Sequence, residues 1–215
     1  MFSSRLEALE HAISIYIDGR NPTSSTFKAE HIHECSRRLI HRARGEKPAS
    51  NSYMSDLGLS CFKNKWLSIF EKIPDINLIA SWVDCCDQKR NIVSVVDCIV
   101  EFEEIKYCVN FIPMGDKLYK QTKKDGFIKR DVVKITCDMW MTEIYNGIIL
   151  YENTITGEYS IFRINFVKDV AKEIIKKCDD LLLCFLYDKL PDKIEDRTQC
   201  RVCEFNHKCW DEGVI

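Results

Sequence analysis

Hydrophobic residues recur along this chain with two spacings, one typical of helices and one typical of strands. Helical spacing predicts helices over residues 6–16, 35–44, 54–73, 131–145 and 168–190. Runs of β-branched and aromatic residues predict strands over residues 91–102, 106–112, 148–152 and 159–166. The polar segments 47–52 and 114–130 are expected to be loops. This order of elements predicts a mixed α/β domain whose small, mostly antiparallel sheet is flanked by helices.

Composition narrows the possible binding surfaces. At 215 residues, of which 46% are hydrophobic and 30% charged, the chain is long enough for one well-buried core. Its formal net charge of −2 gives no general attraction to nucleic acid, so a nucleic-acid surface must be a local patch. Two candidate patches are a group of arginines after Cys35 and the lysine-rich segment 114–130, although either is equally well explained as a solvated face. The candidate nucleic-acid-binding residues are Arg37, Arg38, Arg42, Arg44, Lys123 and Lys124.

The sequence also predicts a cellular location. No apolar run approaches the roughly 20 residues of a membrane-spanning helix. The first ten residues carry acidic side chains and lack the apolar core of a signal peptide. Six of the twelve cysteines lie singly in apolar segments, where a free cysteine packs as a small hydrophobe. We therefore expect a reducing, cytoplasmic environment without a membrane partner. The six are Cys61, Cys98, Cys108, Cys137, Cys178 and Cys184.

The remaining cysteines with a recognisable pattern lie near the two ends of the chain. Cys200, Cys203 and Cys209 are close enough in sequence to face one metal centre, and Cys35 is the natural fourth ligand. Four thiolates are the usual ligands of a four-iron, four-sulfur cluster, and tetrahedral zinc takes the same set. His207 is an alternative zinc ligand. Spacing alone does not separate the two metals.

These cysteines and their surroundings resemble one family. The segment 35–45, with a cysteine followed by basic and apolar residues, and the tail Cys200-x2-Cys203-x5-Cys209 are similar to the cluster-binding segments of iron–sulfur RecB-like nucleases. That branch of the PD-(D/E)XK superfamily includes CRISPR-associated exonucleases and bacteriophage relatives. Segments 139–142 and 147–153 resemble the helix and strand that follow its catalytic strands. The resemblance covers about residues 30 to 210 and favours a four-iron cluster over zinc.

The resemblance implies a domain organisation. It predicts a single restriction-endonuclease-like domain over residues 1–215, with a helical extension at 1–30 and a cluster-binding tail at 198–215. The metal cluster would join the two ends of the chain.

The catalytic motifs of the family are degenerate here. The family places a histidine in G-x-x-x-H, an aspartate on the second strand, E-x-K on the third strand and Q-x-x-x-Y on the next helix. Asp97 fits the aspartate, whereas Phe62 stands in place of the histidine. Val109 and Phe111 stand in place of the acid and the lysine, and segment 134–138 replaces Q-x-x-x-Y.

Metal-dependent hydrolysis needs more than these residues. At least two carboxylates must hold Mg²⁺ or Mn²⁺ against its hydration, and a base must position the attacking water. Glu101 is a possible replacement acid only if its strand is regular. The sequence therefore predicts a catalytically inactive nuclease fold that binds DNA or acts as an adaptor in phage replication, recombination or transcription, with a phage or host protein as partner. The alternative is a divergent, Mg- or Mn-dependent exonuclease acting on single-stranded DNA.

Overall fold

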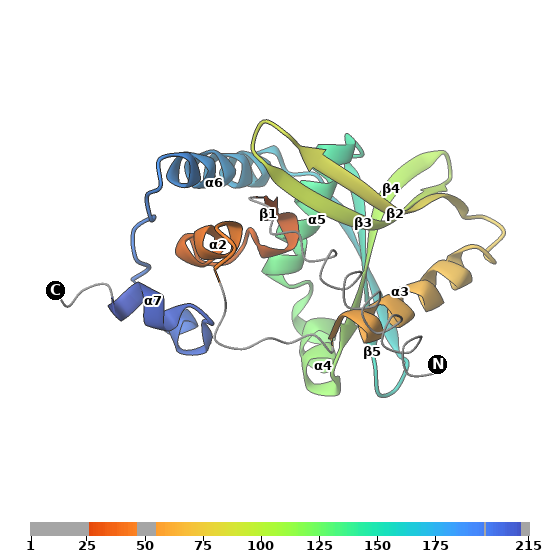
Figure 1. Cartoon of the computed structure of the whole chain (residues 1–215). Coiled ribbons are helices and arrows are strands. Elements are labelled where there is room, and N and C mark those ends of the chain that lie inside the picture. The colour runs from red at the N-terminus through yellow and green to blue at the C-terminus, as the bar shows by residue number, and fades with distance from the viewer. Residues whose placement is uncertain (1–25, 47–54, 196, 212–215) are drawn as a thin grey trace, which may run out of the picture.

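The computed structural model describes residues 26–46, 55–195 and 197–211. A six-stranded mixed sheet lies at its centre, with helices on both faces (Figure 1). The strands are β1 (Phe27–Lys28), β2 (Asn77–Asp87), β3 (Ile92–Phe102), β4 (Ile105–Met114), β5 (Asn146–Asn153) and β6 (Tyr159–Asn165). The helices are η1 (Ala29–His31), α2 (Ser36–Ala43), α3 (Ser55–Phe70), α4 (Asp116–Asp125), α5 (Lys129–Thr142), α6 (Lys168–Leu186), η2 (Gln199–Val202) and α7 (Asn206–Asp211). The predicted α/β class with a mixed, helix-flanked sheet is confirmed.

Strand β3 organises the sheet. Antiparallel β2 pairs with β3 from Ile92 to Glu101. The other edge of β3 is shared, because parallel β1 pairs at residues 92–93 and antiparallel β4 pairs at residues 98–102. Within the described part of the chain, residues 94–97 of β3 therefore have no ladder partner on that edge. Beyond β4, β5 is parallel to β4 and β6 is antiparallel to β5.

Each face of the sheet has its own hydrophobic cluster. Helices α4 and α5 cover one face, where Tyr119 and Ile135 pack with strand residues such as Val96. The approach is close: a Cβ on Gly147 of β5 would lie 2.8 Å from Ile135 Cδ1. Helix α3 covers the other face, where Trp66 and its neighbours pack on β4 and β5. A third cluster joins α2, α5 and α6 around the buried β1.

Several elements were not predicted, and the two longest of them are α4 and β2. Segment 114–130 contains helix α4, which is amphipathic and buries Tyr119 and Thr122. The many lysines of this segment led to the prediction of a loop. Residues 77–87 form β2. This strand was not predicted because the residues around Cys85 and Cys86 are polar. The predicted helix at 6–16, the loop at 47–52 and most of the extension 1–30 lie outside the described residues. Cys61 was expected in an apolar setting and is exposed on α3.

The other predicted elements are present with shifted ends. The last long helix ends at Leu186 and not at residue 190. No helix in the described part of the chain is long and apolar enough to cross a bilayer.

Candidate functional site

Four cysteines from opposite ends of the chain line one small cavity. Cys35 is the N-cap of α2, Cys200 lies in η2, Cys203 follows η2, and Cys209 lies in α7. All four, together with Arg38, face a cavity of about 30 Å³. The fold therefore brings together the candidate ligands that the sequence pattern selected.

The donor set fits a group that four thiolates bind. Besides Arg38, the other residues at the cavity are neutral, so no carboxylate competes with the sulfurs there. Among residues 26–46, 55–195 and 197–211, however, no three His, Cys, Asp or Glu side chains are placed to hold a single metal ion. One zinc ion needs all its sulfurs about 2.3 Å from one point, whereas each cysteine of a four-iron cluster binds a different iron.

A network of charges holds the tail against α2. Glu204, between two of the tail cysteines, forms ion pairs with Arg38 at 2.5 Å and with Arg42 at 2.6 Å. Glu34 pairs with the same two arginines at 3.2 and 2.9 Å. Burial alone would raise the pKa of Glu34, but a hydrogen bond with His31 and the charges of His31, Arg42 and Arg38 lower it to about 2. The cysteine cavity is thus fixed by protein contacts as well as by any bound metal.

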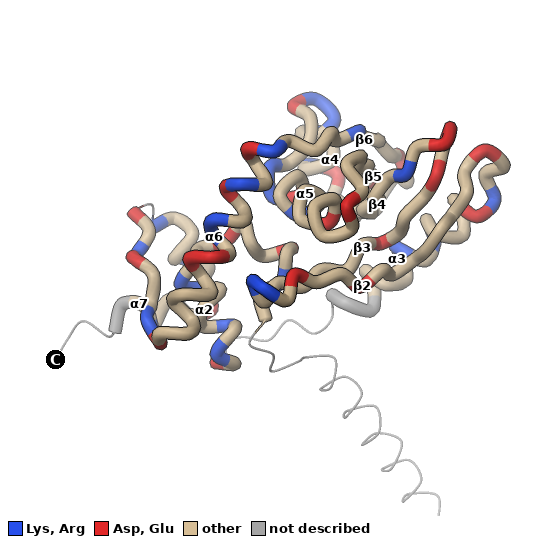
Figure 2. Tube along the Cα trace, turned by 90° about the horizontal axis from the view of Figure 1, so that it is seen from above, with Lys and Arg blue, Asp and Glu red and all other residues tan. Residues whose placement is uncertain are grey.

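This network changes the expected role of the arginines. Arg44 pairs with Asp188 at 2.7 Å, and Arg37 Nε donates to the carbonyl of Pro191 at 2.6 Å. Arg38, Arg42 and Arg44 therefore have their charges balanced within the fold, and Figure 2 shows acidic and basic residues interspersed around α2 and the tail. As free phosphate-binding groups they are much weaker candidates than sequence suggested. Lys123 and Lys124, by contrast, are exposed at the end of α4.

A buried histidine adjoins the cavity. His41 Nε2 lies 3.6 Å from Cys209 Sγ, and its Nδ1 lies 2.9 Å from Glu46. Lys208 also binds Glu46, at 2.6 Å, and Phe205 stacks on the imidazole with ring centroids 5.3 Å apart. No sequence motif pointed to His41. Its place beside Cys209 arises only in the folded chain.

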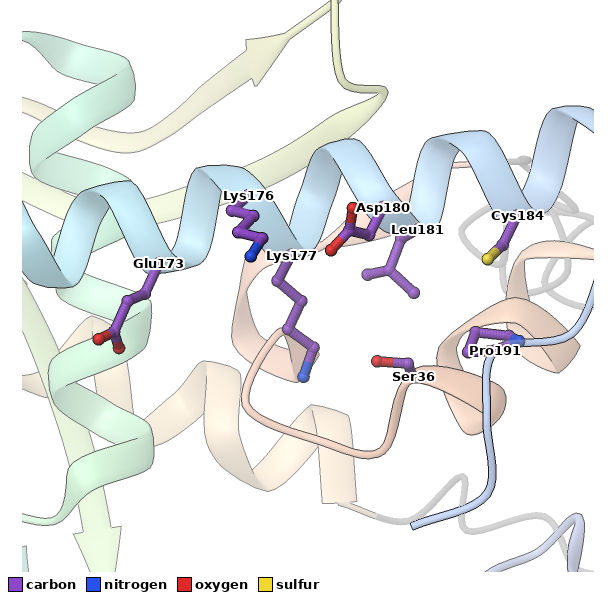
Figure 3. Close-up of a pocket in the computed structure, with 8 residues that line it drawn as sticks. All are labelled: Ser36, Glu173, Lys176, Lys177, Asp180, Leu181, Cys184 and Pro191. Atoms are coloured by element: carbon purple, nitrogen blue, oxygen red, sulfur yellow. The ribbon is translucent and has the colours of Figure 1, made fainter.

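A larger cavity of about 340 Å³ lies between the start of α2 and helix α6. Figure 3 shows Lys177 pointing from α6 toward the N-terminal side of α2, where its Nζ donates to the carbonyl of Glu34 at 2.6 Å. Lys176, Glu173 and Asp180 also line it, so the cavity carries both charge signs. The charges that line this cavity therefore favour neither an anionic nor a cationic ligand.

Asp97, the aspartate that the sequence resemblance selected, has both carboxylate oxygens hydrogen-bonded within the fold. Asp97 is 1% exposed and lies where the β3–β4 ladder begins. Its Oδ1 accepts a hydrogen bond from Lys63 Nζ at 2.6 Å, and its Oδ2 accepts one from the backbone N–H of Phe111 at 2.7 Å. Burial raises the pKa of Asp97, and this outweighs the opposite effects of Lys63, Lys134 and the Phe111 hydrogen bond. Sequence reasoning considered Phe62 but not its neighbour Lys63, because the Lys63–Asp97 pair joins residues that are 34 positions apart and meet only in the folded chain.

The strand beside Asp97 offers no second acid on this face. Tyr107, Val109 and Phe111 of β4 all pack in the α3-side cluster, with Phe62 at its margin. The expected neighbours, Val109 and Phe111, are therefore apolar contacts of α3. A shift of the E-x-K alignment by two residues would not place an acid on this face, because Tyr107, Val109 and Phe111 are alternate residues of β4 and share it.

Glu101 does not replace the missing acid. Val96 and Ile99 pack in the cluster on the α5 side, whereas Cys98 and Val100 pack on the α3 side. The alternation of β3 is thus broken at residues 97–98, opposite the left-handed Trp82 of β2, whose φ is 54°. Continuing from Ile99, Glu101 lies on the α5 side, away from the Lys63–Asp97 pair. The condition of a regular strand is not met.

A second carboxylate does lie on the α3 face, but farther along the sheet. Glu152 of β5 is 5% exposed and binds Lys65 Nζ at 2.6 Å and Trp66 Nε1 at 2.6 Å. Strand β4 separates β5 from β3, so the two backbones are about 10 Å apart. Asp97 and Glu152 each have a lysine partner from α3, which satisfies both charges without a metal.

On the opposite face, Lys134 and Asp138 lie in the segment that the sequence resemblance aligned with Q-x-x-x-Y, and they form an ion pair. Asp138 accepts hydrogen bonds from Lys134 Nζ at 2.7 Å, Ser94 Oγ at 2.6 Å and Asn110 Nδ2 at 2.9 Å. Burial lowers the pKa of Lys134, but the charges of Asp138 and Asp97 raise it more. The ammonium therefore stays charged, and it adds a second positive charge near Asp97.

Comparisons with known proteins give structural matches only. No family model matches the chain, and no curated protein matches it. The crystal structure of SSO0001 superposes with a TM-score of 0.61 at 12% identity over 88% of each chain. The alkaline exonuclease LHK-Exo from Laribacter hongkongensis gives 0.59 at 12% identity, over 76% of this chain and 89% of that one. A phage-related exonuclease from Haemophilus somnus 129PT gives 0.54 at 8% identity, over 74% and 93%.

The chain shares its fold with these structures, two of which are described as exonucleases. At 8–12% identity these matches establish the architecture and leave the chemistry to the residues of this chain. The PD-(D/E)XK-like core that the sequence predicted is confirmed at the level of the fold. Its iron–sulfur branch and phage origin stay predictions.

Proposed function

We propose that this nuclease-fold protein binds DNA without cleaving it, and acts as a DNA-binding or adaptor factor in phage replication, recombination or transcription. The observation that carries the proposal is the Lys63–Asp97 pair, in which both carboxylate oxygens are already hydrogen-bonded. A divalent cation would have to displace the ammonium of Lys63 from Asp97. It would then lie among apolar side chains of β4 that supply no further oxygen ligand. Mg²⁺ gives up its water reluctantly and needs oxygen ligands in return.

The four-cysteine cavity supports a structural metal centre within this function. Cys35, Cys200, Cys203 and Cys209 would hold a four-iron cluster, with zinc as the alternative. A bound cluster would supply covalent links between the α2 segment and the tail. The four cysteines line one cavity, and the resemblance of their sequence pattern to iron–sulfur nucleases is the reason to prefer the cluster to zinc. We expect such a protein to work in the cytoplasm, in the host cell if it is viral.

A second candidate is a divergent Mg- or Mn-dependent exonuclease acting on single-stranded DNA. The exonuclease structures with the same fold favour it, as does the presence of two buried acids, Asp97 and Glu152, on the α3 face. This function would require both lysines of α3 to move away from their carboxylates when metal and substrate bind.

Binding of labelled oligonucleotides tests the proposal. Purified protein with its metal content measured is titrated with labelled single-stranded and double-stranded DNA, and binding is followed by fluorescence anisotropy. We expect saturable binding that weakens as salt increases, with the DNA recovered at full length. Absence of binding to both forms at low salt would contradict the DNA-binding function.

A further inference from the structure

The corner formed by α4 and the start of α5 is strongly basic. Residues 116–130, named here the α4–α5 corner, contain six Lys or Arg and two Asp in a chain with a net charge of −2. Six basic and two acidic residues give this short segment a net charge of +4, so the remainder of the chain carries a net charge of −6. Local concentration of charge attracts polyanions even where the net charge does not.

Most of these charges face solvent without a balancing acid. Lys120 pairs with Asp116 at 2.8 Å and Arg130 with Asp131 at 3.2 Å. No ion pair within the described part of the chain engages the other lysines of the corner, and all are exposed: Lys117, Lys123, Lys124 and Lys129. This distinguishes the corner from the arginines of α2, three of which are bound to carboxylates.

An aromatic ring lies in the middle of the basic corner. Phe127, between Lys124 and Lys129 in the chain, is 52% exposed. Phe162 of β6 meets it edge to face, with centroids 6.4 Å apart and planes at 89°. One side of Phe127 is thereby supported, and much of the ring remains available. An exposed aromatic ring among lysines is the usual arrangement for stacking unpaired bases.

We propose that the α4–α5 corner is a contact surface for single-stranded DNA, with the lysines on the phosphates and Phe127 stacked on a base. This rests on the proposed DNA-binding function and adds the surface and the strandedness. A single strand is favoured because the faces of its bases are accessible, whereas base pairs in a duplex cover one another. The phosphate contacts carry no sequence information, so binding is tolerant of sequence.

The electrostatic part is tested with Lys123→Gln/Lys124→Gln. Its matched control is Lys168→Gln/Lys172→Gln, which removes the same charge from exposed lysines of α6. Loss of two phosphate contacts makes the negative slope of log K against log salt less steep, by about 1.4 on single-stranded DNA. The control leaves the slope unchanged. Equal slopes for wild type and Lys123→Gln/Lys124→Gln would overturn the proposal that the α4–α5 corner contacts DNA.

The stacking part is tested with Phe127→Ala, and Tyr145→Ala is its control. Tyr145 is 55% exposed and packs on Phe166, so it matches Phe127 in exposure and support. Phe127→Ala weakens single-strand binding by about 5- to 150-fold, the effect of one base–aromatic stack, and Tyr145→Ala does not. Wild-type binding by Phe127→Ala, or a preference for duplex, would overturn the inference while DNA binding stands. Absence of any DNA binding by the wild type would overturn the proposed function itself.

Discussion

The ammonium of Lys63 lies 2.6 Å from Oδ1 of Asp97, at the point where β4 joins β3. The pair is nearly closed to solvent, since the Lys63 side chain is 19% exposed and that of Asp97 is 2% exposed. A cation of the chain itself thus balances the carboxylate that the sequence resemblance selected as a metal ligand. Asp97 also accepts a hydrogen bond from the backbone N–H of Phe111.

Lys63→Met should lower the free energy of unfolding by about 3 kcal/mol, because it leaves a buried carboxylate without its partner. Urea denaturation at pH 7 measures the change. Lys72→Met, at an exposed lysine just beyond α3, should alter stability by less than about 0.5 kcal/mol. Combining Lys63→Met with Asp97→Asn should restore part of the loss, because the unpaired charge is gone. An unaltered stability in Lys63→Met would show that the pair is not formed.

The pH dependence of stability tests the environment of Asp97. Folding raises its pKa above the ordinary 3.8, so the folded chain binds this proton more tightly than the unfolded chain. The contribution of Asp97 to stability is therefore most favourable at low pH and declines as pH rises from about 4 through the folded pKa. Lys63, Lys134 and the Phe111 N–H face this carboxyl group and limit the decline.

The measurement compares wild type with Asp97→Asn in urea at several pH values between about 4 and 7. The stability of the wild type relative to Asp97→Asn should fall with increasing pH. A relative stability that rises over this range would mean that the pKa of Asp97 is depressed by its partners, as in an exposed ion pair.

Metal analysis tests the four-cysteine centre. Protein purified without oxygen should contain about four irons per chain and absorb broadly in the visible range. Cys203→Ser should abolish the colour and destabilise the fold, because the link between tail and α2 is cut. Cys184→Ser, at a cysteine away from the four-cysteine cavity, should keep both the colour and the stability of the fold. One zinc per chain in a colourless protein would refute the cluster and leave the ligands in place.

The sequence predicted those parts of the molecule in which spacing carries the information. The cysteine pattern selected four residues that do line one cavity, although about 165 residues separate the first from the second. The β-branched runs located β3 and β4, whose side chains fill the two faces of the sheet. Strand β2 and helix α4 were missed, because β2 is an edge strand with many exposed residues and α4 buries only Tyr119 and Thr122.

The partners of the candidate site could not be predicted. Lys63, Lys65 and Glu152 are separated by up to 89 residues and meet only when α3 lies on the sheet. The break in alternation at Asp97, after which Glu101 lies on the other face, is opposite the left-handed Trp82 of β2, a strand that was itself not predicted. The arginines of α2 were interpreted as free because two of their partners, Glu204 and Asp188, lie at the far end of the chain, while the nearby partner Glu34 was overlooked.

Nuclease activity of wild type and Asp97→Ala measures the central claim most directly. Metal-loaded protein is incubated with end-labelled single-stranded and double-stranded DNA in Mg²⁺ or Mn²⁺, and the products are separated by length. Because Asp97 is bound to Lys63 and its β4 neighbours are apolar, we expect full-length DNA from both proteins under every condition. Shortened products from the wild type that disappear in Asp97→Ala would contradict the account and establish a working metal site at Asp97.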